Sequence, residues 1–257
     1  MGKNITDDEV IRHKKKAIKE LNNTFEAFIN SPNCKHKKKA DLIAYWIESY
    51  SKYLLMEEKF DYKSIPKYKR GDIISLNFGF NVGSEHGGLH YAIVLDNDNK
   101  QSSPVVTVIP LSSGDEKSTY ARDVFLGNEL HTKLSTKYRK LETVVNTEFC
   151  ETTKMISVLE KSVNNAEQRK DIDELLGNLY QKIAELEKKK STLQKYANDI
   201  SKLKEGSIAL MEQITTISKI RIYKPKKSDD LLYGVKLSDS AMNKINEKLK
   251  ELYVYSK

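Results

Sequence analysis

Two of the five histidines in this chain lie close together in one short glycine-rich segment. From Gly83 to His90 the sequence reads G-S-E-H-G-G-L-H, with three glycines, one carboxylate and two imidazoles. Imidazole titrates near neutral pH and can transfer protons, and glycine lets a backbone approach a ligand closely. This composition is typical of a binding or catalytic loop.

Apolar alternating runs flank the loop and predict that a β-hairpin holds it. The two runs are Ile73–Phe78 and Tyr91–Leu95. Functional side chains are commonly carried on loops that a rigid scaffold presents, and a pair of strands is such a scaffold. We therefore expect the loop to project from the end of a hairpin.

The two histidines of the loop, His86 and His90, are four residues apart, and such a pair can ligate a metal. A metal site needs a further cysteine or acidic ligand at a suitable spacing, and the sequence offers none here. The two cysteines, Cys34 and Cys150, also lack metal-type spacing. We therefore expect no metal and no cofactor, and two free thiols in a reducing cytoplasm.

The length and charge of the chain restrict its class. Its 257 residues suffice for one large domain or two small ones. No apolar run approaches the roughly 20 residues that a membrane-spanning helix needs, so we expect a cytoplasmic protein without membrane contact. The formal net charge is +8, yet residues 66–131 carry six basic and eight acidic residues. The basic excess lies outside the segment with the candidate loop and permits a polyanionic partner.

Helical patterns occupy two long parts of the chain. Residues 1–65 predict two helices, the first opened by a capping box at Thr6 and Glu9 and the second running from about 38 to 59. Residues 134–203 predict two long antiparallel helices, because apolar residues recur at spacings of three and four and no proline interrupts them. Such a coiled-coil hairpin is a spacer, a dimerisation arm or a partner surface.

Strand patterns fill the two remaining parts. Residues 66–133 contain four short apolar runs separated by clusters of Gly, Asn, Asp and Ser. Residues 204–257 contain two more runs, 207–214 and 216–223, followed by a helix from about 238 to 253. The sequence therefore predicts an α+β protein with a small, strongly bent antiparallel sheet or barrel.

Two ordered motifs lie in these strand segments. The first is R-G-D-I from Arg70 to Ile73, followed by the Gly83–Gly88 loop. The second runs from Ser207 to Ile222 and reads S-I-A-L-M-E-Q-I-T-T-I-S-K-I-R-I. In order and spacing they resemble the MazF/PemK family, the toxins of bacterial toxin–antitoxin systems. The family patterns are roughly R-G-D-[IV] with G-S-E-x-G-G-x-R-P, and S-[IV]-x-L-x-E-Q-I-R-T-I-[DS]-K-x-R-[LI].

The resemblance implies a fold in which a small SH3-like antiparallel β-barrel, with a closing C-terminal helix, carries long helical additions. It assigns residues 66–133 and 204–257 to the first and second parts of that barrel. Residues 1–65 are then an N-terminal helical extension, and residues 134–203 are a coiled-coil hairpin inserted into one loop.

The resemblance also implies an activity and partners. Members of the family are metal-independent endoribonucleases that cleave single-stranded RNA, in particular mRNA, by attack of the ribose 2′-hydroxyl. A homodimer formed through the barrel edge and a cognate antitoxin protein are implied as well. Two alternatives stay open: a catalytically weak member that binds nucleic acid or a partner protein, and a scaffold whose functional part is the coiled coil.

Aligned on these motifs, the two catalytic positions of the family fall on His90 and Ser112. His90 stands where the family has arginine. Histidine is the better general acid or base, whereas arginine offers a fixed cation and a bidentate fork for phosphate. A histidine at the start of a strand is also commonly structural.

The resemblance further implies a set of RNA-binding residues. Arg70 contacts phosphate or pairs with an acid such as Asp72, and Glu85 either orients the loop or a base or ties loop amides together. Glu212 and Gln213 belong to a predicted strand, where alternation turns one of the two side chains inward. The substrate-binding candidates are Arg70, Gly83, Ser84, Glu85, His86, Gly87, Gly88, Ser113, Glu212 and Gln213.

Overall fold

The computed structural model describes residues 5–164 and 169–255. The chain divides into two compact units. The helical unit consists of the chain as far as Phe60 together with the Gly79–Gly88 loop, and the sheet unit consists of Asp61–Phe78 and the chain from Leu89 onward.

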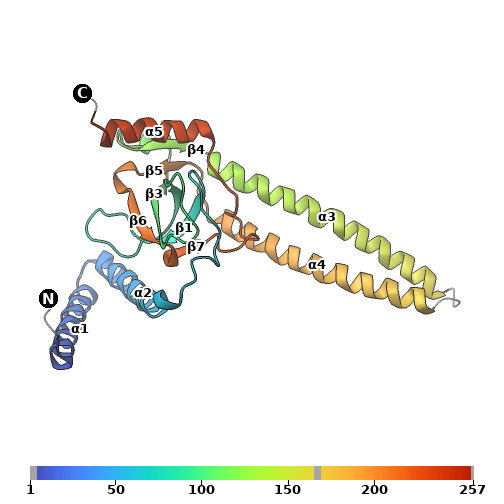
Figure 1. The fold of residues 1–257 in the computed structure, drawn as a ribbon, viewed down its shortest axis with the longest axis horizontal. Coiled ribbons are helices and arrows are strands. Elements are labelled where there is room, and N and C mark those ends of the chain that lie inside the picture. The colour runs from blue at the N-terminus through green and yellow to red at the C-terminus, as the bar shows by residue number, and fades with distance from the viewer. Residues whose placement is uncertain (1–4, 165–168, 256–257) are drawn as a thin grey trace. The chain divides into compact units, whose positions relative to one another are not determined.

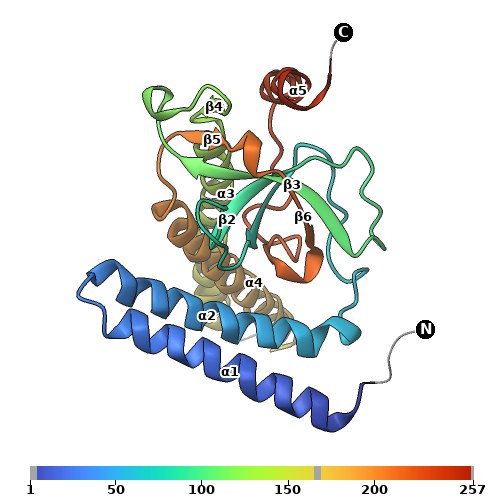
Figure 2. The ribbon, with the colours of Figure 1, turned by 90° about the vertical axis from the view of Figure 1, so that its left-hand side faces the viewer.

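The helical unit is built on two helices, α1 (Asp7–Ile29) and α2 (Cys34–Met56), which run antiparallel (Figure 2). Thr6 caps α1 in the predicted capping box, in which its hydroxyl accepts the Glu9 N–H and the Glu9 carboxylate accepts the Thr6 N–H. The second helix begins earlier than the sequence pattern predicts, because the side chain of Asn33 accepts the N–H of Lys35 and caps the helix there.

The sheet unit contains seven strands: β1 (Ile73–Asn77), β2 (Leu89–Val94), β3 (Val105–Ser113), β4 (Val124–Gly127), β5 (Ser207–Ala209), β6 (Thr215–Ser218) and β7 (Ile222–Lys224). Every pair is antiparallel, in the order β4-β5-β3-β2-β1-β7, and β6 pairs with β3. The predicted α+β class with an antiparallel sheet is confirmed. The sheet is not closed into a barrel, since the path ends in two short strands, β4 and β7, that do not pair with each other.

The long strand β3 bends the sheet. Its first half, Val105–Val108, pairs with β6, and its last residues, Leu111–Ser113, pair with β5. Both partners come from the segment after residue 203, so the sheet is complete only when the two strand segments meet. The division of the chain into a barrel interrupted by an insertion stays a prediction.

Two predicted strands prove to be interrupted. The run 207–214 is split by a 3₁₀ turn at Met211–Gln213, and the run 216–223 is split by another at Lys219–Arg221. In the second turn the fully buried ammonium of Lys219 donates to the carbonyls of Lys100 (2.9 Å) and Gln101 (3.4 Å). In a continuous strand the Lys219 side chain would point in another direction and could not form these two bonds. Hydrogen bonding to a distant segment therefore favours the turn over a strand.

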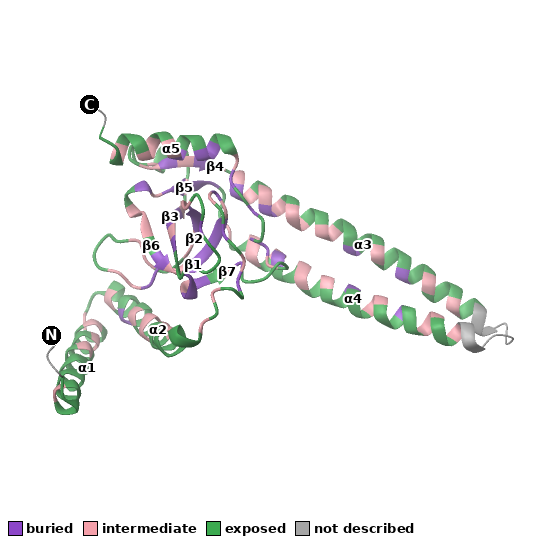
Figure 3. Ribbon diagram, in the orientation of Figure 1, coloured by how far each residue is buried: buried purple, intermediate pink, exposed green. Residues whose placement is uncertain are grey.

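The main core lies against one face of the sheet and is shared by sheet and helices (Figure 3). Ile93 and Ile109 come from central strands, and Leu134 and Ile245 come from the helices that follow β4 and close the chain. All four are completely buried. Burial of a large aliphatic side chain stabilises by about 1.5–3 kcal/mol, so this layer holds the sheet and helices together.

The helices α3 (Glu129–Asn164) and α4 (Arg169–Ser201) form a hairpin that projects from the sheet (Figure 1). The two long antiparallel helices predicted for residues 134–203 are therefore observed, and the predicted turn at Asn165 lies outside the described residues. An ion pair from Lys182 to Glu151 at 2.8 Å links the two helices within one chain.

The last helix, α5 (Asp239–Tyr253), packs against the core as the predicted closing helix. The hydroxyl of Ser238 caps it by accepting the Ala241 N–H, and the hydroxyl of Tyr253 donates to the carbonyl of Met211 at 2.8 Å.

No helix in the described ranges has both the length and the apolar character needed to cross a membrane.

Candidate active site

The ladder between β2 and β3 ends two residues short of His90 and Ser112. Three pairs define its register: Ala92 with Pro110, Ile93 with Ile109, and Val94 with Val108. Continued by two residues, this register sets Ser112 opposite His90. Residues directly opposite in an antiparallel pair carry their side chains on the same face.

Strand alternation shows which face that is. Ile93, Ile109 and Leu111 belong to the main core. His90 and Ser112 are offset from them by an odd number of residues and lie on the other face, because successive side chains of a strand alternate. Both residues are half-buried. Strand alternation therefore turns both predicted positions away from the main core, and Ser112, which pairs with Ile208 of β5, lies beyond the last β2–β3 pair.

The strand that carries Ser112 is clamped at its end. Ser112 pairs with Ile208 and Ser113 with Ser207, and the N–H of Gly114 donates to the carbonyl of Gly206 at 3.3 Å. A Cβ atom on Gly206 would lie 2.0 Å from the Gly114 carbonyl oxygen. The backbone beside Ser112 and the exposed Ser113 is thus held by a contact that only glycine permits.

The predicted loop is organised by its own hydrogen bonds. The Glu85 carboxylate accepts the Val82 N–H at 3.3 Å, and the side-chain amide of Asn81 donates to the His86 carbonyl at 2.7 Å. Of the two interpretations of Glu85, this contact favours the one in which the carboxylate ties loop amides together. Ser84 and Glu85 are exposed.

Glycines close the base of this loop. The N–H of Gly88 donates to the carbonyl of Gly79 at 2.6 Å, and a Cβ atom on Gly87 would lie 2.8 Å from that same oxygen. Gly83 has a φ of 64° with open space around it. Glycine at these positions is required by the backbone, which accounts for the G-S-E-H-G-G pattern without a ligand.

Arg70 is hydrogen-bonded within the protein, and its predicted contact with phosphate stays a prediction. Its guanidinium donates to the carbonyl of Leu95 and, at 2.6 Å, to the side-chain oxygen of Asn246 in α5. The carboxylate of Asp72 instead accepts the N–H of Lys69 at 2.8 Å. These contacts favour a structural role for Arg70 in fastening the last helix to the sheet.

Glu212 and Gln213 lie in the 3₁₀ turn after β5, so the strand alternation argued from the sequence does not apply to them. The Glu212 carboxylate pairs with Arg122 at 2.8 Å, and both side chains are about half exposed. The neighbouring Asp123 accepts the N–H of Met211 at 3.0 Å, and burial raises the pKa of its carboxyl.

Residues 69–183 match the family model described as PemK-like, MazF-like toxin of type II toxin-antitoxin system. The chain carries a PemK/MazF-type toxin domain. The matched residues include β1 to β4 with His90 and Ser112, and they end inside α4. A search of curated proteins found no significant match.

Part of the toxin fold lies outside the matched residues. The second motif, 207–222, supplies β5, β6 and β7, and these strands pair with β3 and β1 of the matched segment. The structure therefore joins both motifs in one sheet, in agreement with the resemblance seen in the sequence.

Two positions, one in the glycine-rich loop and one beside the end of β3, were not anticipated from the sequence. Asn81 braces the loop, and Gly206 permits the close approach of the chain beside Ser113. Gly206 stands directly before a strand pattern, which is a weak sign that glycine is needed there. That pattern does not reveal that the carbonyl of Gly114 lies against it. Among the described residues, no three His, Cys, Asp or Glu side chains gather as a metal site.

Proposed function

We propose that this chain is the toxin of a toxin–antitoxin system and acts as a metal-independent endoribonuclease on single-stranded RNA. The family match supports the toxin assignment. The enzymatic part is supported by the register of β2 and β3, which would set Ser112 opposite His90 if it were continued by two residues.

His90 and Ser112 together supply the groups that this reaction needs. The neutral imidazole of His90 takes the proton of a ribose 2′-hydroxyl, whose oxygen attacks the adjacent phosphorus. The bond between phosphorus and the 5′-oxygen breaks, and that oxygen takes up a proton from water, while the protonated His90 returns its proton to solvent. The products are a 2′,3′-cyclic phosphate and a 5′-hydroxyl end. The hydroxyl of Ser112 donates a hydrogen bond to a phosphoryl oxygen as negative charge develops.

The experiment is cleavage of a mixed-sequence RNA by purified protein in the presence of a metal chelator, with mapping of 5′-hydroxyl ends. Wild type and His13→Ala, a control on the exposed surface of α1, should both cut. His90→Ala and Ser112→Ala should lose about 10²–10⁴-fold in rate, the usual contribution of a positioned acid–base group. Full activity of His90→Ala would refute the assignment.

One alternative is favoured by a specific observation, namely that histidine replaces the family arginine at position 90. A histidine lacks the bidentate fork that holds phosphate, so this chain would bind RNA or a partner without cutting. If neither wild type nor His90→Arg cuts any RNA in the mixture, the binding function replaces the enzymatic one.

The proposed toxin acts in the cytoplasm with two protein partners, a second copy of the chain and an antitoxin. The family match supports the antitoxin, and the resemblance in the sequence implies the second copy. Co-expression with a protein encoded beside the toxin should abolish RNA cleavage and relieve any growth arrest that this cleavage causes. The mass of the purified protein in solution gives the oligomeric state.

A further inference from the structure

A large open cleft of about 1290 Å³ lies where the base of the helical hairpin meets the sheet unit. Its three walls are the segment Lys63–Lys69, the part of α4 from Glu185 to Tyr196, and the loop Lys226–Tyr233. None of the candidate active-site residues lines it. The cleft is therefore separate from the site around His90.

Lysines line all three walls of this cleft. The first wall carries three, at positions 63, 67 and 69, while α4 carries Lys188 and Lys189 and the loop carries Lys226 and Lys227. Only two carboxylates, Glu185 and Asp229, line the same cleft. Seven cations against two anions give the cleft a strong positive potential.

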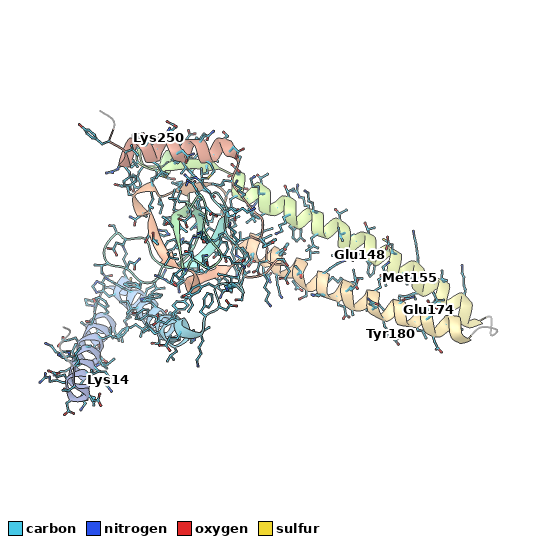
Figure 4. All side chains as sticks on the ribbon, in the orientation of Figure 1. Lys14, Glu148, Met155, Glu174, Tyr180 and Lys250 are labelled. Carbon is cyan, nitrogen blue, oxygen red and sulfur yellow. The ribbon has the colours of Figure 1, made fainter. Side chains whose placement is uncertain are left out.

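Most of these ammonium groups are not neutralised. Lys67 pairs with Asp98 at 3.0 Å, and Lys189 pairs with Glu148, which Figure 4 labels on α3. Within the described part of the chain, the other five lysines of the cleft form no ion pair. They are available to an external anion.

The first wall is fixed from beneath. The side-chain amide of Gln101 donates to the carbonyl of Lys63 at 2.7 Å and to that of Ile65 at 3.0 Å. The buried hydroxyl of Tyr68 donates to the carbonyl of Pro225 at 2.7 Å, which ties this wall to the start of the opposite loop. The lysines thus project from a backbone that is already ordered.

The loop that carries Lys226 and Lys227 is also held in place. The Asp230 carboxylate accepts both of their N–H groups, at 2.6 and 3.0 Å. The Tyr196 hydroxyl donates to the Asp229 carbonyl at 2.9 Å. Binding a ligand between walls that are already ordered loses little backbone entropy, which favours affinity.

We propose that this cleft binds the phosphate backbone of single-stranded RNA, as an anchoring site outside the cutting site. The inference rests on the proposed function, because it names a second contact for the same substrate. Single-stranded RNA combines a negative charge at every nucleotide with bases that stack on aromatic rings. Tyr233, on the cleft wall, is 45% exposed and can stack with a base.

An acidic protein segment fits the cleft less well. A bound peptide gains most from an unpaired strand edge or from a continuous apolar groove. The walls here are an irregular segment, a helix and a loop, so they offer no strand edge. Most of the charged side chains that line the cleft are lysines, and a chain of phosphates can form an ion pair with each of them.

The test uses binding of a fluorescent 20-nucleotide 2′-O-methyl RNA, which cannot be cut because its 2′-oxygen is blocked. The variant is Lys188→Gln/Lys226→Gln/Lys227→Gln in the full chain. The control, Lys14→Gln/Lys15→Gln/Lys19→Gln on the exposed surface of α1, removes the same charge. Circular dichroism establishes that both variants are folded.

The cleft variant should bind at least tenfold more weakly than the control at 0.1 M salt. Its slope of log K against log salt should be smaller by about 2, since each phosphate contact to a single strand contributes about 0.7. Equal affinities and equal slopes for the two variants would overturn the proposal. Displacement of the RNA by polyglutamate at equal charge concentration would instead identify an acidic protein as the occupant.

Cleavage assays separate this inference from the proposed function. The cleft variant should cut a five-nucleotide RNA at the wild-type rate and show a raised KM for long RNA only. If wild type cuts no RNA but still binds the 2′-O-methyl RNA through these lysines, the enzymatic proposal fails and the anchoring site stands.

Discussion

Gly206 provides a test of how tightly the chain is clamped beside Ser112 and Ser113. It has a φ of 76°, and a Cβ atom there would lie 2.0 Å from the backbone oxygen of Gly114. In Gly206→Ala the left-handed backbone costs about 1–2 kcal/mol. The steric overlap adds about 1–3 kcal/mol because a backbone atom, not a flexible side chain, must move. The expected loss in the free energy of unfolding is about 2–5 kcal/mol.

Two other glycines separate these contributions. Gly234 has a φ of 70° with nothing within 4 Å of the added Cβ, so Gly234→Ala isolates the backbone cost of about 1–2 kcal/mol. Gly177 lies inside α4 with open space around it. Gly177→Ala should stabilise by about 0.5–1 kcal/mol, since alanine is the better helix former.

The assay is urea unfolding of the three variants followed by near-ultraviolet circular dichroism of the tyrosines. The only tryptophan, Trp46, lies in α2 and reports on the helical unit, so its fluorescence does not serve here. If Gly206→Ala loses no more stability than Gly234→Ala, the close approach of Gly206 to Gly114 is not a feature of the folded protein.

Two further predictions concern buried charges. The Lys137 ammonium donates to the carbonyls of Asp230, Leu231 and Tyr233, and burial lowers its pKa. Lys137→Met should therefore lower the free energy of unfolding by about 1–3 kcal/mol and speed amide exchange in that loop, whereas unchanged exchange would contradict the anchoring role. Burial also raises the pKa of Asp72 in the folded state. Because a raised pKa favours the protonated folded form, stability is lost as the pH rises through it. Urea unfolding at several pH values should show Asp72→Asn gaining stability relative to wild type as the pH rises from acid to neutral, and a constant difference would refute this.

Local patterns in the sequence predicted much of this fold. The capping box at Thr6 and the cap at Ser238 mark helix starts because a side-chain oxygen accepts an N–H that has no partner within the helix. The spacing of apolar residues predicted the long helices α3 and α4, and the alternation around the loop predicted β1 and β2. Each of these signals depends on residues that are near one another in the chain.

Other features required partners that are distant in the sequence. The 3₁₀ turn at Lys219–Arg221 accompanies the bonds from Lys219 to carbonyls more than 100 residues away. The hydrogen bond from Arg70 to Asn246 of α5 likewise joins residues far apart in the chain. The basic cleft also combines three segments that are distant from one another in the sequence.

By itself, the sequence indicated the family resemblance and the class of fold, and it predicted two catalytic positions, His90 and Ser112. These rest on ordered motifs and on periodicities of two and 3.6 residues, which local chemistry sets. Only the tertiary structure decided that the sheet stays open, that Ser112 pairs with Ile208 of β5, and that lysines gather at the base of the hairpin. Strand register and charge clustering depend on which distant segments pack together, and no local pattern specifies that.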